Sequence, residues 1–441
     1  MSPKEKSQRW LKENVEAIAI AVVMALVIRH FAIEAFKIPT ESMAPTLLGD
    51  RLGGGTGDRI LVDKVGPMIF GLDRWDIFVF KYPLNTARNY IKRVVGFGGE
   101  TLSIRDGDVW IDGEIARKPP GAQEVLYYPV YPADERLPPL RGSGSNPFRV
   151  EKEYWKRPSK DVFEVAIADG LSLARFDNDV KDAPTWEGER YGTDRVGDLR
   201  LRLTVVPESG QVVLRLVENK IANDLVLAVG SGESYLLHGE ERIPLPDFVL
   251  EPGEETEIVF ENVDDALHVT VDGDRVSHEY QGPDQIDHFD DQVRFGVRNG
   301  AARFSDLGLD RDVYYVRNGN CKSERIPEGH YFALGDNSRN SRDSRLWNLR
   351  VYEAPDGQVF KMDNSQQDSE TRIQRGPEPF TMMFQDWEGV WRVVPESLLD
   401  DDYKTTEAAP FIPAKNVVGR AFFVFWPLNP LKGQFRLKFI R

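Results

Sequence analysis

The sequence predicts a mainly β protein with an N-terminal transmembrane helix, a discontinuous β-rich core and an inserted β-sandwich of the jelly-roll type. Three observations lead to this fold class. One apolar run, Val15 to Ile28, approaches the ~20 residues that a membrane-spanning helix needs. Short apolar runs bounded by turn residues follow it. The middle of the chain, from Lys160 to Asp312, instead alternates apolar and polar residues at regular spacing, as sandwiches do.

The N-terminal segment begins with a basic flank, and only Glu16 interrupts the apolar run that follows. Three interpretations are open: a removable signal peptide, a buried helix and a membrane anchor. A cleavable signal ends in small residues at alternate positions, and Ala35 with Ile33 two residues earlier fits this badly. The basic flank favours an anchor. We therefore expect a single pass through the inner (cytoplasmic) membrane, with the N-terminus in the cytoplasm and the rest outside.

Length and charge narrow the classes of protein. The 441 residues indicate two or three domains at roughly 100–200 residues each. The formal net charge of -15 argues against a nucleic-acid partner, because phosphate contacts need clustered Lys and Arg. Cys321 is the single cysteine and forms no intrachain disulfide, so apolar cores alone must stabilise the fold.

The β-rich core is expected in separate pieces. Arg59–Asp63 and Asp76–Phe80 read as short strands, and Val109–Ile111 lies between two Asp-Gly turns, which is typical of a hairpin. Ala421–Trp426 is an apolar strand that stops at Pro427. The predicted parts are a basic flank and anchor (1–34), the first part of the core (35–155), the sandwich (156–314), a core loop (315–348), a second, polar insertion (349–413) and a C-terminal core strand (414–441).

Ser42 is the candidate nucleophile, a few residues after the apolar run. A serine hydroxyl is weak until a base removes its proton. His330 is the one histidine near a motif, and strand alternation places it opposite Tyr331, so we expect a strand residue rather than a base. Lys92 is the better candidate because its neighbours are apolar, and burial lowers a lysine pKa from ~10.4. The alternative is an exposed Lys92–Arg93 basic pair.

A polar loop, Gly335–Arg345, is the third candidate segment. A solvated loop and a calcium loop are alternatives, and the second lacks the regular alternation and terminal glutamate of an EF-hand. The loop instead offers hydroxyls that can orient a neutral amine and an Asp–Arg pair that can fix its own shape.

These segments, in order, resemble the boxes of bacterial type I signal peptidase, the leader peptidase of the Ser-Lys class. The matching boxes are Pro39–Thr46, Gly57–Val62, Lys92–Gly96 and Gly335–Arg345, and Gly419–Ala421 with Trp426-Pro427 resembles the C-terminal strand of that family. The resemblance covers roughly the first 120 residues, the loop near 330–347 and the last 30. Each box alone is moderate evidence, and the full order is highly specific.

The resemblance implies a membrane-bound serine endopeptidase that cleaves N-terminal signal peptides from exported preproteins. It implies that Ser42 is the nucleophile and Lys92 the general base of a Ser-Lys dyad. Thr40 and the backbone N–H of Ser42 form the oxyanion hole, and Ser341 orients the lysine amine. No metal or cofactor is implied. The positions that support the site are Met43, Arg93, Asp336, Asn337, Asp343 and Arg345.

Some features depart from that family. Asn348 follows Trp347 where the family usually has glycine, and the loop between the first two boxes is longer and glycine-rich. The two insertions have no counterpart in compact members. These departures leave the catalytic assignment unaffected. How the two insertions lie over the substrate groove stays open.

The inserted sandwich has a looser resemblance of its own. Asp264–Gly273 and Phe295–Leu307 are similar to concanavalin-like jelly-roll domains of the laminin-G or glycoside-hydrolase-associated type, which often bind glycans, some with calcium. Trp186 and Tyr235 are aromatic residues available for a sugar. A structural or protein-docking insert is the open alternative, because fold does not imply function.

The expected partners are preproteins that carry signal peptides, the lipid bilayer and a glycan or protein ligand of the sandwich. The alternative function is a membrane-tethered glycan-binding protein with an inactive peptidase-like core. Retention of every catalytic side chain favours the peptidase. A self-cleaving Ser-Lys regulator is a third interpretation, but it lacks a DNA-binding segment and leaves the apolar run unexplained.

Overall fold

The structure is a computed structural model that describes residues 14–17, 20, 24, 32–52, 55–133, 137, 147–182, 194–282, 292–319, 323–354, 357–364, 373–387, 390–399, 404–429 and 434–440. Within these residues, no helix combines the length and the apolar character needed to cross a membrane. The predicted anchor falls largely outside the described residues and stays a prediction.

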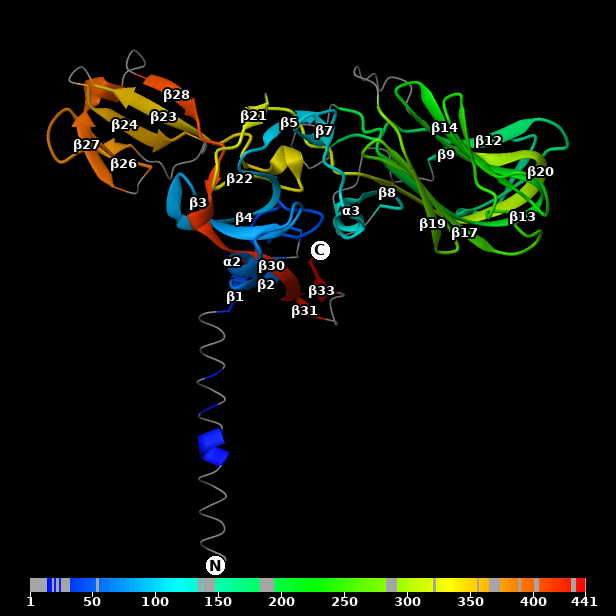
Figure 1. Ribbon diagram of the computed structural model, residues 1–441, viewed down its shortest axis with the longest axis horizontal. Coiled ribbons are helices and arrows are strands. Elements are labelled where there is room, and N and C mark those ends of the chain that lie inside the picture. Colours follow the sequence, from blue (N-terminus) through cyan, green and yellow to red (C-terminus); the bar gives the residue numbers. More distant parts are fainter. Residues whose placement is uncertain are drawn as a thin grey trace, which may run out of the picture. The chain divides into compact units, whose positions relative to one another are not determined.

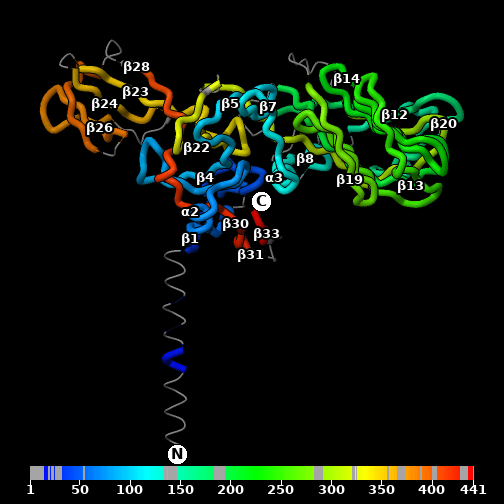
Figure 2. Tube along the Cα trace, viewed as in Figure 1, coloured from blue at the N-terminus to red at the C-terminus, as the bar shows by residue number. Residues whose placement is uncertain are grey.

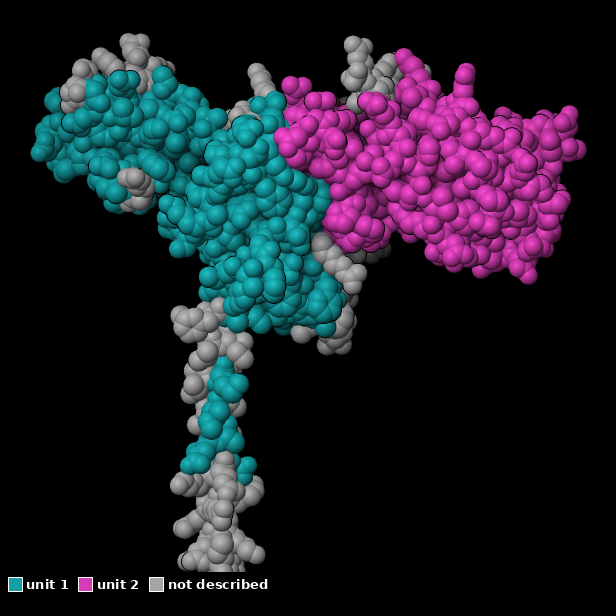
Figure 3. All heavy atoms as spheres, in the orientation of Figure 1, with its two compact units in different colours: residues 1–102, 318–441 teal, residues 103–317 magenta. Residues whose placement is uncertain are grey.

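The chain forms two compact units, coloured separately in Figure 3. The first comprises residues 1–102 and 318–441, and the second comprises residues 103–317. The chain therefore leaves the first unit once and returns to it. The domain bounds predicted from the sequence, with a sandwich at 156–314, stay a prediction beside these two units.

The first unit contains an eight-stranded sheet in the order β1-β2-β30-β3-β4-β22-β29, with β33 paired to β30 (Figure 1). The C-terminal strand β30 lies between strands from the N-terminal part, as the red and blue tubes of Figure 2 show. This sheet is thus built from three stretches of sequence. Its strands are β1 (Ile33–Lys37), β2 (Arg59–Asp63), β3 (Ile77–Tyr82), β4 (Asn85–Phe97), β22 (His330–Leu334), β29 (Ile412–Pro413), β30 (Val417–Trp426) and β33 (Lys438–Phe439).

Apolar side chains on the two sides of this sheet form two clusters. One contains Met43 and Leu47, from the segment after β1, packed with Ile60, Val79 and Val424. The other is largely aromatic and includes Phe78, Phe80, Tyr82, Tyr90 and Trp347. Within it the rings of Tyr82 and Tyr90 stack with centroids 4.4 Å apart. The first cluster therefore holds the Ser42 segment against the sheet, and the second holds Trp347 at the end of the polar loop.

The remaining strands of the first unit form small sheets around this core. One is β24-β23-β28 and another is β25-β26-β27. They share a separate core that includes Tyr352, Phe384 and Val394. The elements are α2 (Gly66–Phe70), β21 (Glu324–Arg325), β23 (Asn348–Glu353), β24 (Val359–Asp363), β25 (Gln374–Arg375), β26 (Thr381–Gln385), β27 (Trp391–Pro395), β28 (Lys404–Ala408), β31 (Leu428–Asn429), β32 (Gln434–Phe435) and the 3₁₀ turns η2 (Ser338–Asn340), η3 (Glu396–Leu399) and η5 (Ala414–Asn416).

The second unit is built on a thirteen-stranded sheet folded into two leaves. Its strands are β8 (Tyr128–Tyr131), β9 (Phe148–Arg149), β10 (Trp155–Ser159), β11 (Val162–Ala166), β12 (Leu171–Phe176), β13 (Leu199–Glu218), β14 (Ile221–Ala228), β15 (Tyr235–His238), β16 (Glu241–Pro244), β17 (Thr256–Val263), β18 (Ala266–Val271), β19 (Asp274–Glu279) and β20 (Gln292–Arg311). The strands β6 (Asp108–Ile111) and β7 (Glu114–Ile115) and the helix α3 (Pro120–Leu126) accompany them, and β5 (Thr101–Arg105) contains the point in the chain where the first unit ends and the second begins.

Two long strands join the leaves. The first half of β13 pairs with β17 and its second half pairs with β14, while β20 pairs with both halves. The register of the β13–β20 pairing shifts between Arg202 and Thr204 and again around Ser209. Bulges of this kind bend a strand, so the strand can pass from one leaf into the next. Leu201, Leu203 and Val205 are buried, as their alternation predicts. The mainly β fold with a β-sandwich is confirmed.

Candidate active site

Ser42 lies in a turn that follows β1, and hydrogen bonds fix this turn from both ends. Ile38 N donates to Asp58 O at 2.8 Å, and Leu48 N donates to the Asp58 carboxylate at 2.8 Å. Glu41 accepts from two further backbone N–H groups, those of Gly49 at 2.8 Å and Leu52 at 3.0 Å. The backbone around Ser42 is therefore held rigidly, which is what a positioned nucleophile requires.

Lys92 points at Ser42 from the sheet. Lys92 lies on β4 opposite Phe78 of β3. Its Nζ donates a hydrogen bond to Ser42 Oγ at 2.6 Å, and the two residues are 4% and 8% exposed. The Tyr90 ring, with its centroid 5.9 Å from Nζ, adds to the apolar surroundings. Lys92 and Arg93 are both buried, so the alternative that they form an exposed basic pair is wrong.

Burial lowers the pKa of Lys92 from 10.5 to about 8, because an ammonium loses its hydration inside the protein. The carboxylates of Asp343 and Asp336 oppose this shift, and the Arg345 guanidinium adds to it. Each of these carboxylates is already paired with an arginine, so their attraction for the ammonium is reduced. The neutral amine is consequently accessible near neutral pH.

Arg93 fixes the polar loop to the sheet. Its guanidinium makes two hydrogen bonds to the Asp336 carboxylate, Nε to Oδ1 at 2.9 Å and Nη2 to Oδ2 at 2.7 Å. Both side chains are fully buried. Nη1 also donates to the carbonyl oxygen of Trp75 at 2.6 Å. Since β22 pairs with β4 and places Leu334 opposite Arg93, the loop begins beside the lysine.

A second arginine fixes the shape of the loop itself. Arg345 donates to Asp343 through Nε at 2.8 Å and through Nη2 at 2.7 Å. It also donates to the hydroxyl and the carbonyl oxygen of Ser338, at 2.6 and 2.7 Å. Asp343 in turn accepts from Gly335 N at 3.0 Å. Such bidentate charge-assisted bonds restrain geometry more than single neutral ones.

The loop docks directly on the turn that carries Ser42. Asn337 N donates to Ser42 O at 3.1 Å, and Asn337 Nδ2 donates to Glu41 O at 3.1 Å. Gly335 lies so close that a Cβ there would be 2.5 Å from Ser42 O and 2.1 Å from Ser341 Oγ. Only glycine fits this contact, and it brings Ser341 to the site.

Two further hydroxyls of the candidate site belong to Thr40 and Ser341. Thr40 Oγ1 lies 3.5 Å from Ser42 Oγ, a weak hydrogen bond in which either group is the donor. Ser341 is buried, and its Oγ has no hydrogen-bond partner within the described residues. The bond from Ser341 to Lys92 that the resemblance implies is thus not made in this arrangement. His330 lies at the far end of β22 from Gly335 and pairs through Nδ1 with Glu328 O at 2.9 Å.

Some contributors were not anticipated from the sequence. Glu41 organises the turn, Ser338 anchors Arg345, and the Trp75 carbonyl receives Arg93. Trp75 has φ of 78°, a left-handed conformation that is costly for a tryptophan. A bulky residue between Arg74 and Asp76 carries no sequence signal for such a role. Glu41 lies between the paired Thr40 and Ser42, where its polar character gave only a weak hint.

The chain belongs to the signal peptidase family, peptidase S26, whose model matches residues 11–153 and 252–364. A relative from Synechocystis, "Probable signal peptidase I-1", is 32% identical over 147 residues, covering 32% of this chain and 67% of that protein. "Signal peptidase I T" of Bacillus subtilis is 34% identical over 116 residues, covering 26% and 55%. The chain spans between about half and two thirds of the length of these relatives.

A putative glycosyl hydrolase from Parabacteroides distasonis aligns with 42% of this chain and 98% of its own, at 10% identity and a TM-score of 0.26. A likeness at that level carries no argument about function.

Proposed function

We propose that this chain is a membrane-bound serine endopeptidase that cleaves N-terminal signal peptides from exported preproteins by a Ser-Lys dyad. The observation that carries the proposal is the 2.6 Å contact between Lys92 Nζ and Ser42 Oγ in a buried setting that lowers the lysine pKa to about 8. A base must reach its nucleophile and have a pKa near the working pH. Membership of the signal peptidase family supports the same activity.

The reaction follows from these two groups. Neutral Lys92 takes the proton of the Ser42 hydroxyl while Oγ bonds to the scissile carbonyl carbon, and the carbonyl oxygen becomes an oxyanion. The intermediate then collapses, the C–N bond breaks, and the Lys92 ammonium gives its proton to the leaving amine. Water attacks the acyl-enzyme with Lys92 again as the base, which releases the signal peptide and restores Ser42.

We assign the oxyanion hole to the Thr40 hydroxyl and the backbone N–H of Ser42. Both lie on the rigid turn, and a preorganised donor of this kind contributes about 3–4 kcal/mol in known proteases. Ser341 is assigned to the lysine amine: it is brought there by the Gly335 contact and has an unused hydroxyl. Met43, Arg93, Asp336, Asn337, Asp343 and Arg345 hold these groups in place.

The proposed substrates carry small residues one and three positions before the cut, and their cleaved segment is extended. An extended peptide binds readily along an exposed sheet edge. The strand β1 is terminal in its sheet and leads directly to Ser42, so we assign the substrate to this edge. The glycan or protein ligand of the sandwich has no assigned site in this proposal.

The proposed location is the inner membrane, with the catalytic unit on its extracytoplasmic side. Ser42 follows Ile28 by 14 residues, so it lies within ~50 Å of the end of the apolar run at about 3.3–3.6 Å per residue. A preprotein whose own apolar helix is still in the bilayer presents its cleavage site within that reach.

The test is cleavage of a preprotein by the full chain in membranes. We expect wild type to release the signal peptide, and Ser42→Ala and Lys92→Ala to lose at least ~10³-fold in rate, as loss of a nucleophile or its base does. Lys81→Ala is the matched control, because Lys81 is exposed on the neighbouring strand β3. Equal cleavage by wild type and the two dyad variants would overturn the proposal.

A further inference from the structure

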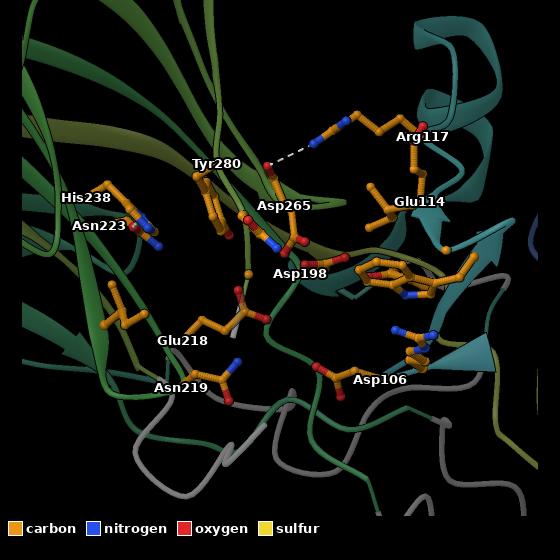
Figure 4. A pocket seen from close by; sticks show the side chains of 18 residues that line it. Asp106, Glu114, Arg117, Asp198, Glu218, Asn219, Asn223, His238, Asp265 and Tyr280 are labelled. Carbon is orange, nitrogen blue, oxygen red and sulfur yellow. Dashed lines mark hydrogen bonds between the residues drawn. The ribbon is translucent and has the colours of Figure 1, made fainter. Parts of the chain in front are cut away.

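The second unit contains a cavity of about 390 Å³ whose residues have no place in the proposed reaction (Figure 4). It lies between the β6–β7 hairpin and the strand ends of the sandwich at β13, β14 and β19. Its volume falls in the range of small-molecule sites, roughly 300–1,000 Å³, and is far larger than one metal ion requires.

The lining of the cavity is strongly acidic. Against the two guanidinium groups of Arg105 and Arg117 stand six carboxylates: Asp106, Asp108, Glu114, Asp198, Glu218 and Asp265. Figure 4 shows the carboxylates of Asp198, Glu218 and Asp265 pointing toward a common space. An ionised carboxylate only accepts hydrogen bonds, so an occupant that supplies hydrogen-bond donors and positive charge suits this lining.

The two arginines are already engaged elsewhere. Arg117 donates to the backbone carbonyls of Asp264 and Asp265, at 3.1 and 3.4 Å, and pairs with Glu279 at 3.3 Å. The Arg105 guanidinium lies 4.8 Å from the centre of the Trp110 ring. The Arg117 guanidinium attracts the Asp265 carboxylate, but six carboxylates outnumber the two guanidinium groups, and the lining includes no lysine among the described residues.

The chain itself places an ammonium beside this cavity. Lys118 Nζ contacts Asp264 and Asp312, the second at 2.8 Å, and its side chain is 2% exposed. Oxygen atoms of Asp108, Asp198, Asp264 and Asp312 all lie within 4.8 Å of one another. The Lys118 ammonium therefore shows that this group of carboxylates accommodates an organic cation. Because the ammonium occupies the position where a metal ion would bind, it argues against a metal at the same point.

Asp108 and Asp198 connect the Lys118 cluster to the open cavity, since both also line it. Burial raises the pKa of each, and for Asp108 the charges of Asp198 and Asp264 raise it further. For Asp198 the charge of Glu218 adds to the effect of burial. Both groups therefore hold a proton more readily than an ordinary aspartate, and a cation bound in the cavity would favour their charged forms.

The other walls suit an organic cation. Tyr280 stacks on His238 with ring centroids 4.1 Å apart, and His238 Nδ1 lies 2.8 Å from Asn223 Oδ1. Burial lowers the pKa of His238, so it is neutral at pH 7 and adds no positive charge. Tyr280 and Trp110 also line the cavity, and their aromatic side chains offer apolar contact to methylene groups.

We propose that this cavity binds a small organic cation with more than one primary ammonium group, of the polyamine class. The ammonium groups take the positions facing Asp198, Glu218 and Asp265, and the methylene chain lies along the aromatic walls. This site is independent of the Ser42–Lys92 chemistry, so either proposal stands or fails alone.

The test is isothermal titration calorimetry of the purified full chain with spermidine. We expect saturable one-to-one binding that weakens as salt rises, because the attraction is electrostatic. Glu218→Gln with Asp265→Asn should weaken binding roughly tenfold or more, as two partly buried charge contacts are lost. Asp247→Asn with Glu251→Gln removes two exposed carboxylates outside the cavity lining and is the charge-matched control.

A further variant covers the case in which the double variant does not fold. Glu114→Gln lies at an exposed position of the hairpin and should also weaken spermidine binding with an unchanged melting temperature. No saturable binding, or equal weakening by the control pair, would overturn the proposal. Tight Ca²⁺ binding that spermidine does not displace would also overturn it and identify a divalent-cation site instead.

Discussion

Lys92 Nζ lies 2.6 Å from Ser42 Oγ, although 50 residues separate the two in sequence. The contact exists because a strand and a turn that belong to different parts of the first unit are each fixed by buried bonds of their own. Glu41 and Asp58 hold the turn, and the β3–β4 pairing holds the lysine. The consequences of this relationship can be measured.

The first prediction concerns the pH dependence of cleavage. The pKa of Lys92 is lowered to about 8, so the amine is mostly protonated below that pH and neutral above it. We expect kcat/KM to rise about tenfold per pH unit up to about 8 and then to level off. A pH–rate profile with chemistry shown to be limiting measures this, and a rate independent of pH below 8 would contradict it.

The second prediction concerns stability. The folded pKa of Lys92, about 8, lies below the unfolded value of 10.5, so the folded state binds this proton less tightly. The resulting penalty is present in full below pH 8 and disappears as the pH rises to 10.5. Lys92→Met should therefore raise the free energy of unfolding at pH 7 by about 3 kcal/mol.

Urea denaturation of inactive variants measures this difference. Lys81→Met, on the exposed side of β3, is the control and should leave stability nearly unchanged. A Lys92→Met variant that is less stable than wild type at pH 7 would show that the lysine contributes net stability and would contradict the prediction.

The third prediction concerns the buried pair of Arg93 and Asp336. Arg93→Met leaves the Asp336 carboxylate buried without its partner, and we expect a loss of about 3–5 kcal/mol in unfolding free energy. Arg93→Met combined with Asp336→Leu removes both charges and should cost clearly less than the single change. Denaturant titration of both variants decides; equal losses would mean that charge burial is not the cause.

The fourth prediction concerns Gly335. An added Cβ would meet Ser42 O at 2.5 Å and Ser341 Oγ at 2.1 Å, so Gly335→Ala must push the loop away from the nucleophile turn. A displacement of this kind costs on the order of 10²-fold in kcat. Gly329→Ala is the control: no atom lies within 4 Å of its Cβ, although its φ of +72° makes the change mildly strained. Similar rates for the two variants would be the contrary result.

The fifth prediction concerns Ser341, which we treat as a positioning residue. Ser341→Ala should lower kcat by roughly 10- to 100-fold and shift the pH profile of the Lys92 amine, with little change in KM or stability. Ser341→Thr keeps the hydroxyl and should recover part of the rate. An unshifted pH profile with full activity in Ser341→Ala would remove the residue from the mechanism.

Much of the site was predictable because its chemistry is concentrated in short segments. Ser42, Lys92 and the loop from Gly335 to Arg345 are each recognisable by residue type and order. The residues that hold these segments in place were harder to predict from the sequence. Glu41 acts through backbone N–H groups of Gly49 and Leu52, and Trp75 acts through its carbonyl oxygen, so neither role depends on the side chain that the sequence displays.

The predictions about the middle of the chain had a different outcome. Alternation correctly predicted buried residues such as Leu203, because it depends on the two faces of a single strand. The same pattern could not predict that β13 bends at bulges and serves both leaves, since pairing partners lie far away in sequence. Of the two aromatic residues available for a sugar, Trp186 lies outside the described residues and Tyr235 is buried.

The sequence by itself determined the candidate reactive groups of this protein: a serine, a lysine and a polar loop, in an order that indicates the family. Only the tertiary structure decided that the lysine is buried, because desolvation depends on residues brought together from β3, β4 and the loop after β22. It also decided that Asp108, Asp198, Asp264 and Asp312 meet around one lysine. These charges are spread over more than 200 positions, so the sequence does not show that they interact. Their interaction energies depend on distances that only the folded structure sets.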